Sequence, residues 1–353
     1  MKTTTAFYTL LALILLTACE NPIAFKTIVH EDGSLDKTIV LEKTRKDNAD
    51  QNYFGVNQQS GWTVEITEDE SEKDDHKYRI AFSKHFNSVD DVNSELDRPA
   101  DTLFQIHSTF EKKFRWFYTY IHYTETIRPI NRFTLTPVEN FFNQEDFAFI
   151  DRLPGEGTAI SKADSVYLEV LNEKISDRFV KMALFDEANN MIKAVIAKNN
   201  IDKRWLDTLD QNKELIYRII DDPKSENNIP AQIADTLGIP LDKDQAGKDF
   251  EALSKKFESR LNFMSYAYDG GKYVNEIHLP WEIIHSNADS VVQNVAVWKP
   301  LAVKFALRDY TMYAECRQMN VWAVLVSVGI GLLTVVLFVK EIRVVKVFPD
   351  KKA

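Results

Sequence analysis

The stretch FKTIVHEDGSLDKTIVL, residues 25–41, decides the fold, because apolar and polar side chains alternate on both sides of Asp32 and Gly33. Alternation with a period of two is the pattern of a strand with one buried face. An Asp-Gly pair between two such runs is a strong signal for a tight hairpin turn, since glycine adopts the positive φ that the turn needs. The sequence therefore predicts an antiparallel strand pair near the N-terminus.

Further strands extend this pattern as far as residue 127. Two alternating runs follow the hairpin, at Trp62, Val64 and Ile66 and at Tyr78, Ile80 and Phe82. Residues 103–110 and the stretch FRWFYTYIHYTETI, residues 114–127, are rich in aromatic and β-branched side chains and lack proline and glycine. This composition favours strands, so we expect a long strand pair here.

The aromatic stretch has two interpretations. Trp116, Tyr118 and Tyr120 fall on one face of the predicted strand, because successive side chains of a strand alternate between its faces. A strand that is apolar on both faces is usually covered on both, here by the helices that follow, which would make these rings core residues. The sharper interpretation is that the three rings form a platform for a hydrophobic ligand.

A helical block is predicted after Pro137. Apolar residues recur at steps of three and four along residues 166–196, with one break near 189–190, and again along residues 201–220 and 250–261. This spacing places apolar side chains on one side of a helix. Pro223 marks the end of the second helix. Residues 137–261 are therefore expected to form the helical block.

Strand patterns return after residue 261. The run NFMSYAYDGGKYVNEIHL, residues 262–279, has a Gly-Gly pair between two alternating halves, and residues 291–298 and 303–313 supply two more strands. The order of strands, helices and strands predicts an α+β fold, in which one antiparallel sheet is built from N- and C-terminal strands around an inserted helical block. The ectodomain then has a β-rich part at residues 19–136, the helical block, and C-terminal strands at residues 262–316.

The N-terminus carries an export signal. Residues 1–18 contain a basic residue, a short apolar run and small residues, as in a secretory signal peptide. The sequence from Leu16 to Cys19, LTAC, matches the lipobox of bacterial lipoproteins. This resemblance implies that Cys19 becomes the new N-terminus and carries a diacylglycerol lipid with acyl chains such as palmitate.

The C-terminus carries a membrane anchor. The uncharged stretch VWAVLVSVGIGLLTVVLFV, residues 321–339, is about 28 Å long as a helix and predicts a transmembrane span. The tail at residues 340–353 has five basic and two acidic residues, which predicts a cytoplasmic tail. The ectodomain is then expected in the periplasm, on a bacterial inner membrane. The lipid on Cys19 and the helix 321–339 both make the bilayer a partner.

The two anchors constrain each other. A compact ectodomain of about 300 residues has a radius of gyration near 19 Å and does not bridge two membranes. Both anchors are therefore expected in one bilayer, with the first and last segments of the ectodomain close together beside it.

Composition excludes several kinds of function. A formal net charge of −10 argues against a nucleic-acid partner, because phosphate binding requires clustered lysine and arginine. The motifs GxSxG, HExxH and CxxC and the P-loop are absent from the sequence, so no catalytic residue and no cofactor is predicted. With Cys19 lipidated, Cys316 has no partner for an intramolecular disulfide, and we expect an inert thiol.

One weak metal candidate remains. Glu276 and His278 stand at positions i and i+2, where side chains of a strand share a face and could share an ion, and Glu282 and His285 follow closely. Pro280 predicts a bend between the two pairs. Structural or solvent-facing side chains are the favoured interpretation.

The C-terminal strands resemble those of a known family. EIHLPWEIIHSNADSVVQNVAVWKP, residues 276–300, is similar to the strand, proline turn and strand of LppM-like bacterial lipoproteins. The matching residues are Leu279, Pro280, Asn287, Ala288, Val297 and Trp298. The resemblance covers residues 23–66 and 262–340 and implies a small α/β or β-rich envelope domain that binds lipid. Trp281 stands where the family usually has glycine, and the helical block has no counterpart in it.

Three functions compete at this point. The double anchor and the absent catalytic motifs favour a non-catalytic envelope module that binds or scaffolds a protein partner. The aromatic strand and the family resemblance favour a protein that binds lipid or another hydrophobic ligand. An envelope hydrolase is the third possibility and would require carboxylates or histidines that meet in a cleft.

Overall fold

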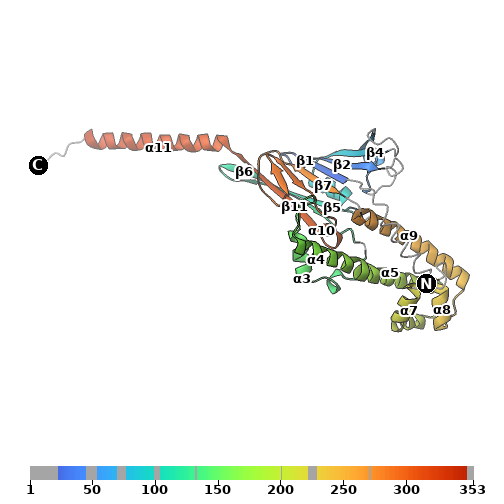
Figure 1. Cartoon of the computed structure of the whole chain (residues 1–353). Coiled ribbons are helices and arrows are strands. Elements are labelled where there is room, and N and C mark those ends of the chain that lie inside the picture. Colours follow the sequence, from blue (N-terminus) through green and yellow to red (C-terminus); the bar gives the residue numbers. More distant parts are fainter. Residues whose placement is uncertain are drawn as a thin grey trace.

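The computed structural model describes residues 23–44, 54–69, 77–98, 104–131, 133–199, 201–221, 229–269 and 272–347. The predicted signal peptide, Cys19 and the end of the basic tail lie outside these ranges. Two β-sheets, a group of helices and a long C-terminal helix make up the described part (Figure 1). The predicted α+β class is confirmed.

The first sheet contains strands from both halves of the chain. Its strand order is β3-β4-β2-β1-β7-β10-β9. The strands are β1 (Ile23–Val29), β2 (Leu35–Thr44), β3 (Thr63–Asp69), β4 (Lys77–Phe86), β7 (Tyr273–His278), β9 (Ser290–Val292) and β10 (Val295–Trp298). The predicted hairpin joins β1 to β2, and Gly33 in its turn has a φ of 91°. β1 and β7 pair in parallel, so this sheet is mixed and not wholly antiparallel.

The second sheet has the strand order β5-β6-β11-β8. Its strands are β5 (Ile106–Phe114), β6 (Tyr118–Ile127), β8 (Ile283–Ser286) and β11 (Tyr310–Met319). The predicted strand pair at residues 103–127 is confirmed as β5 and β6. Strands from the two ends of the chain therefore build two sheets, where the sequence predicted one.

The two sheets pack face to face as a sandwich. Alternate side chains of each strand point inward, as in β1, where every second residue is buried. One continuous core includes Phe25, Ile39 and Ile80 from the first sheet and Ile121 and Tyr123 from the second. Burial of these side chains is the main contribution to folding, at about 25 cal/mol per Å² of apolar surface.

In the described part of the chain, most helices lie between β6 and β7, while the short helix α2 comes before β5 and the helices α10 and α11 come after β10. The helices are α2 (Val89–Leu96), α3 (Gln144–Arg152), α4 (Lys162–Glu173), α5 (Lys181–Lys198), α6 (Arg204–Gln211), α7 (Lys213–Asp221), α8 (Ile229–Leu237), α9 (Lys243–Asp269), α10 (Val303–Ala306) and α11 (Val321–Val347). A π-helical segment, Lys174–Val180, joins α4 to α5 without a break. Short 3-10 turns lie at Gln58–Ser60 and Val138–Asn140.

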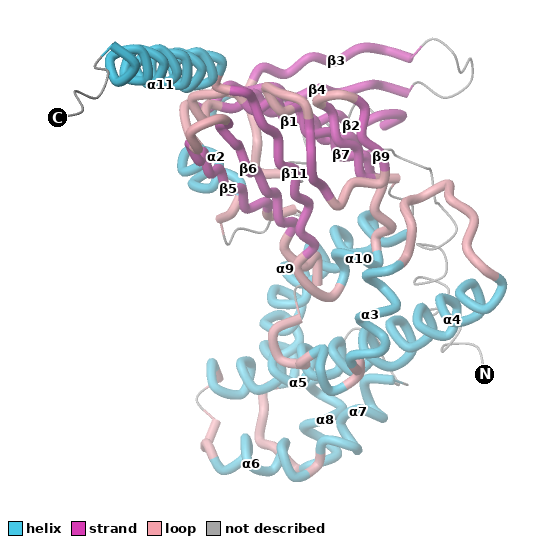
Figure 2. The backbone as a smooth tube through the Cα atoms, turned by 90° about the vertical axis from the view of Figure 1, so that its left-hand side faces the viewer, coloured by secondary structure: helices cyan, strands magenta, loops and turns pink. Residues whose placement is uncertain are grey.

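The helices end in a lobe with its own core. Leu171 and Phe179, in the first half of the continuous helix from Lys162 to Lys198, belong to the sandwich core. Farther along this helix, Ile192 and Ile196 pack with Leu209, Ile216, Ile233 and Ile239 in a second cluster. Figure 2 shows α6, α7 and α8 at the end of the molecule away from the strands. We call α6, α7, α8 and the ends of α5 and α9 around them the helical lobe.

Several boundaries differ from the sequence prediction. Residues 262–269 continue α9 and do not form a strand, because this helix runs back from the lobe to the sandwich in one piece. Residues 303–306 form the short helix α10, and the strand begins at Tyr310. The long helix has no break at 189–190 and carries its irregularity at the π-helical segment. The predicted helix at 201–220 is two helices separated by Asn212.

The direction of β1 overturns one expectation. Ile23, the first residue of β1, donates its backbone N–H to Lys272 after α9, at the end of the sandwich that faces the helices. The turn after β1 lies at the other end, where the Lys112 ammonium donates to the carbonyl of Glu31. α11 leaves the sandwich at this second end, directly after β11. The first and last segments of the ectodomain therefore lie at opposite ends, not side by side.

Candidate functional site

The first candidate site surrounds the start of α11. Val321–Lys340 is, in the part of the chain that the structure describes, the one helix long and apolar enough to cross a membrane, with a mean hydropathy of 2.6 and almost no residue buried inside the protein. The helix runs away from the rest of the protein as a straight, isolated element (Figure 1). An apolar helix without protein around it requires another apolar environment.

Asn320 fixes this helix to the sandwich. Its side-chain amide donates to the carbonyl of Arg115 at 2.7 Å, and its side-chain oxygen accepts from the Thr119 hydroxyl at 2.9 Å. Its backbone N–H donates to the carbonyl of Phe117 at 2.8 Å, and its own carbonyl accepts from Ala323 in the first turn of α11. The turn between β5 and β6 and the start of α11 therefore form one hydrogen-bonded unit.

An aromatic collar, which we define as Phe114, Trp116, Phe117 and Trp322, surrounds this unit. Trp322 stacks on Phe114, with ring centroids 6.1 Å apart, and meets Trp116 edge to face at 5.5 Å. The indole N–H of Trp116 donates to the Ser327 hydroxyl on the next turns of α11. All four rings are about half exposed. Large exposed aromatics beside an apolar helix are typical of a membrane–water interface.

The predicted platform is divided in the structure. Trp116 lies in the turn and contacts α11, whereas Tyr118 and Tyr120 lie on β6, half-buried on the outer face of the second sheet. Their ring centroids are 6.3 Å apart, and the Arg317 guanidinium lies 4.9 Å from the Tyr118 ring. The opposite face of this strand, which carries the fully buried Ile121, faces the core. A ligand for the outer rings stays a prediction.

The inner face of the same strand carries a buried charge. The Glu125 carboxylate is fully buried between the sheets, where it pairs with the Lys37 ammonium of β2. It also accepts hydrogen bonds from Thr27 at 2.6 Å and Tyr123 at 2.8 Å, and from the Asn275 amide at 3.2 Å. Burial alone would raise the pKa of Glu125, but Lys37 and the hydrogen bonds from Thr27 and Tyr123 outweigh it and lower that pKa.

This cluster links the two sheets and gives no opening for a substrate. Glu125 comes from the second sheet, and Lys37, Thr27 and Asn275 come from three adjacent strands of the first. Each of the four side chains is at least nine-tenths buried. A general acid or base must reach the proton that it transfers. The geometry of Glu125 is therefore that of a structural ion pair and not that of a hydrolase.

The predicted metal candidate on β7 is a simple pair. Nε2 of His278 lies 3.4 Å from Oε2 of Glu276, on the outer face of the first sheet, so the two side chains share a face as predicted. His285 is on β8 in the second sheet, where it faces Glu315 in the register with β11. Of the four residues named together from the sequence, two lie on β7, His285 lies on β8, and Glu282 lies in the segment just before β8.

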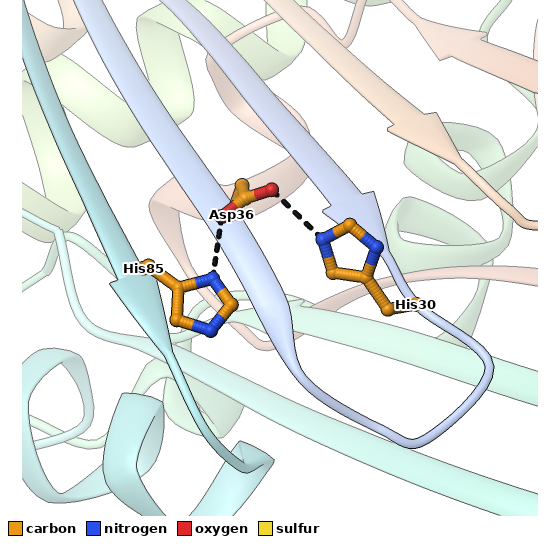
Figure 3. A group of neighbouring side chains, drawn as sticks. All are labelled: His30, Asp36 and His85. Carbon is orange, nitrogen blue, oxygen red and sulfur yellow. Dashed lines mark hydrogen bonds and ion pairs between the residues drawn. The ribbon is translucent and has the colours of Figure 1, made fainter.

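A second group with metal-binding side chains escaped the sequence analysis. His30, Asp36 and His85 come from the end of β1, from β2 and from β4, and Figure 3 shows both imidazoles pointing at the two oxygens of the same carboxylate. Nε2 of His30 lies 2.8 Å from Oδ2 of Asp36, and Nδ1 of His85 lies 2.6 Å from Oδ1. The sequence offers no local spacing for it, because His30 and His85 meet only through the register of three strands.

Comparisons with known proteins identify no family. No family model and no curated protein matches the chain. Among solved structures, the folded domain of the Mycobacterium tuberculosis LppM protein is similar at 7% sequence identity and a TM-score of 0.29, over 85% of this chain and 91% of that chain. This structural similarity is weak, and no functional argument is drawn from it.

Proposed function

We propose that this chain is a membrane-anchored envelope lipoprotein, with its sandwich and helical lobe on the periplasmic side of a bacterial inner membrane, and that it acts as a non-catalytic binding or scaffold module. The observation that carries the proposal is the aromatic collar. It lies where the sandwich meets an apolar helix of transmembrane length, and it holds that helix in a fixed direction. Indole rings prefer the headgroup level of a bilayer.

The rest of the fold supports a scaffold more than an enzyme. The helical lobe has its own core, and the helices α5 and α9 hold it away from the strands (Figure 2). Its surface is therefore available to a protein partner. On α4, Val166 and Val170 are each 54% exposed, one turn apart. The buried charge at Glu125 stabilises the sandwich without access for a substrate.

Depth-dependent quenching tests where the collar lies. The full chain, in bilayers with a nitroxide quencher either at the headgroup or deep in the acyl chains, should lose more tryptophan fluorescence to the headgroup quencher. Trp116→Phe should remove part of that quenched signal. Trp205→Phe is the matched control, because Trp205 belongs to the helical lobe and should contribute nothing to it. Equal behaviour of the two variants would contradict a collar at the interface.

Site-specific crosslinking tests the binding role. A photoreactive residue at Val166 should form a discrete adduct in intact cells, because Val166 lies on the exposed apolar side of α4. The same residue at Ser165, exposed about 100° around the helix, is the control and should form none. Adducts of equal yield at both positions would argue against a specific partner on this face.

Lipid binding is the second candidate. It is favoured by Arg317, whose guanidinium covers the half-exposed Tyr118 ring next to the collar, in reach of a phospholipid headgroup. Native mass spectrometry of the full chain in detergent should then show retained phospholipid that Tyr118→Ala reduces. Tyr313→Ala is the control, because Tyr313 lies farther from α11 on the same strand as Arg317. An unchanged lipid load in Tyr118→Ala would remove this candidate.

A further inference from the structure

Three strands of the first sheet bring two imidazoles and one carboxylate to a single point. Asp36 and His85 are directly opposed in the register of β2 and β4. His30 follows the last residue of β1, and its backbone is held to Ser34 across the hairpin turn at 2.9 Å. Neighbouring and diagonal positions on one face of a sheet bring side chains into contact. All three ligand side chains therefore lie on the outer face, on a rigid strand scaffold.

We propose that His30, Asp36 and His85 form a binding site for a divalent transition-metal ion such as Zn²⁺. One ligand atom from each residue lies within 4.8 Å of the others. Nε2 of His30, Nδ1 of His85 and a carboxylate oxygen of Asp36 are three ligands of the types that zinc takes in proteins, with the fourth position left to water or to a side chain of a partner.

The spacing of the three groups fits an ion with little movement. At metal–ligand distances of about 2.0–2.2 Å, a tetrahedral site places its ligand atoms about 3.3 Å apart. The two nitrogen–oxygen distances, 2.8 and 2.6 Å, must lengthen by less than about 1 Å, and the distance between the two nitrogens, which is within 4.8 Å, must reach the same value. The side chains of His30, Asp36 and His85 are 42%, 42% and 55% exposed, so an ion in solution reaches them directly.

The ligand set selects the class of metal. Calcium and magnesium prefer an all-oxygen environment, whereas imidazole nitrogens suit zinc, copper and nickel. A second histidine distinguishes this group from two other His–carboxylate pairs in the part of the chain that the structure describes. His107 and Asp97, 2.8 Å apart, and His278 and Glu276 each supply one imidazole and one carboxylate. Those two pairs serve as internal controls. If His30 and His85 only form surface hydrogen bonds with Asp36, their substitution should affect Zn²⁺ binding no more than substitution of His107 or His278.

Zinc titration of the full chain tests the proposal. The detergent-solubilised protein, freed of metal by dialysis against a chelator, should bind one equivalent of Zn²⁺ in isothermal titration calorimetry. His85→Ala and Asp36→Asn should each weaken that binding at least tenfold, and His107→Ala and His278→Ala should leave it unchanged. Absence of saturable binding, or equal affinity in His85→Ala and the parent protein, would overturn the site. Loss of binding in His278→Ala alone would overturn it in favour of β7.

Two further measurements keep the result independent of folding. Zn²⁺ should raise the melting temperature of the parent protein, because an ion that binds only the folded state stabilises it. It should not raise the melting temperature of His85→Ala, whose melting temperature without metal should match that of the parent. Co²⁺ should give the intense visible absorption of a four-coordinate site in the parent and lose it in Asp36→Asn. Weak, six-coordinate Co²⁺ spectra in both proteins would count against three protein ligands.

Discussion

The ring of Phe114 lies nearly parallel to that of Trp322, with 7° between their planes and 6.1 Å between their centroids. Phe114 ends β5, and Trp322 is the second residue of α11. Such aromatic pairs contribute about 0.5–1.5 kcal/mol beyond the burial of their surface. The stack therefore fixes the direction of the apolar helix relative to a strand that is distant in sequence. The hydrogen bonds of Asn320 to the turn between β5 and β6 act in the same way.

Asn320→Ala should loosen this junction. The substitution leaves the Arg115 carbonyl and the Thr119 hydroxyl without their partner, at a cost of about 1–3 kcal/mol. Thermal unfolding in detergent should show a lower melting temperature for Asn320→Ala than for the parent chain. Thr119→Val removes one of these hydrogen bonds, so its melting temperature should lie between those of the parent chain and Asn320→Ala. A melting temperature of Asn320→Ala equal to that of the parent would show that the hydrogen bonds of Asn320 do not stabilise the junction.

Lys37→Met should destabilise the sandwich strongly. It leaves the Glu125 carboxylate buried without a counter-charge, which costs about 3–5 kcal/mol. The double variant Lys37→Met with Glu125→Leu removes both charges and should recover most of the loss, because well-packed apolar replacements of a buried ion pair are often neutral. Chemical denaturation measures both unfolding free energies. A double variant less stable than Lys37→Met would contradict this account.

Asp146→Asn should lower stability at neutral pH and less so in acid. Burial raises the pKa of Asp146, but hydrogen bonds from Lys174, from the backbone of Asn143 and from Tyr167 outweigh burial and lower it below 3.8. A carboxyl group whose pKa is lower in the folded than in the unfolded state stabilises the fold at every pH above its unfolded-state pKa. This stabilisation disappears as the pH falls through the folded-state pKa. Unfolding free energies of parent and variant should therefore converge below about pH 3.8. Glu145→Gln, on an exposed neighbour, should match the parent throughout.

Gly33→Ala should destabilise more than Gly157→Ala. Both glycines have a positive φ, 91° and 84°, which costs an alanine about 1–2 kcal/mol. A Cβ on Gly33 would also lie 3.1 Å from the Phe110 ring, whereas nothing lies within 4 Å of one on Gly157. The difference between the two melting temperatures measures the contact with Phe110. Equal losses would mean that the ring moves aside.

Cys316 should resist alkylation in the folded chain. Its side chain is fully buried in β11, and burial raises the pKa of its thiol to about 11. The reactive thiolate is therefore scarce at pH 8, and the reagent also has no path to it. Peptide mapping after iodoacetamide should find Cys316 modified only when denaturant is present. Modification at the same rate without denaturant would contradict the packing of β11.

Local patterns predicted those parts of the fold that local physics determines. The hairpin at Gly33 was correct, because alternation and an Asp-Gly turn act within a few residues. The strand expected at residues 262–269 was wrong, because a short aromatic run satisfies a strand and a buried helix equally and only the return path from the lobe decides between them. The division into two sheets was missed for the same reason, since strand pairing across the inserted helices leaves no local signal.

The candidate sites also differ in whether local sequence or long-range strand pairing brings their residues together. Trp116, Tyr118 and Tyr120 were identified from composition, but their separation into turn and strand depends on where β5 ends. Asp36 and His85 are 49 residues apart and meet through the register of β2 with β4. Register is set by the whole buried face of each strand. A cluster of this kind therefore cannot be predicted from spacing, whereas a pair such as Glu276 and His278 can.

The direction of β1 also sets how the ectodomain rests on the membrane. Cys19 precedes Ile23 by four residues, a reach of about 14 Å at most, whereas β1 itself covers about 20 Å between Ile23 and Val29. If a lipid on Cys19 and helix α11 share one bilayer, β1 must tilt by at least about 45° from the membrane normal. The ectodomain then lies tilted against the membrane, attached at Cys19 and at α11, and removal of the lipid would let the sandwich and α11 change their tilt together.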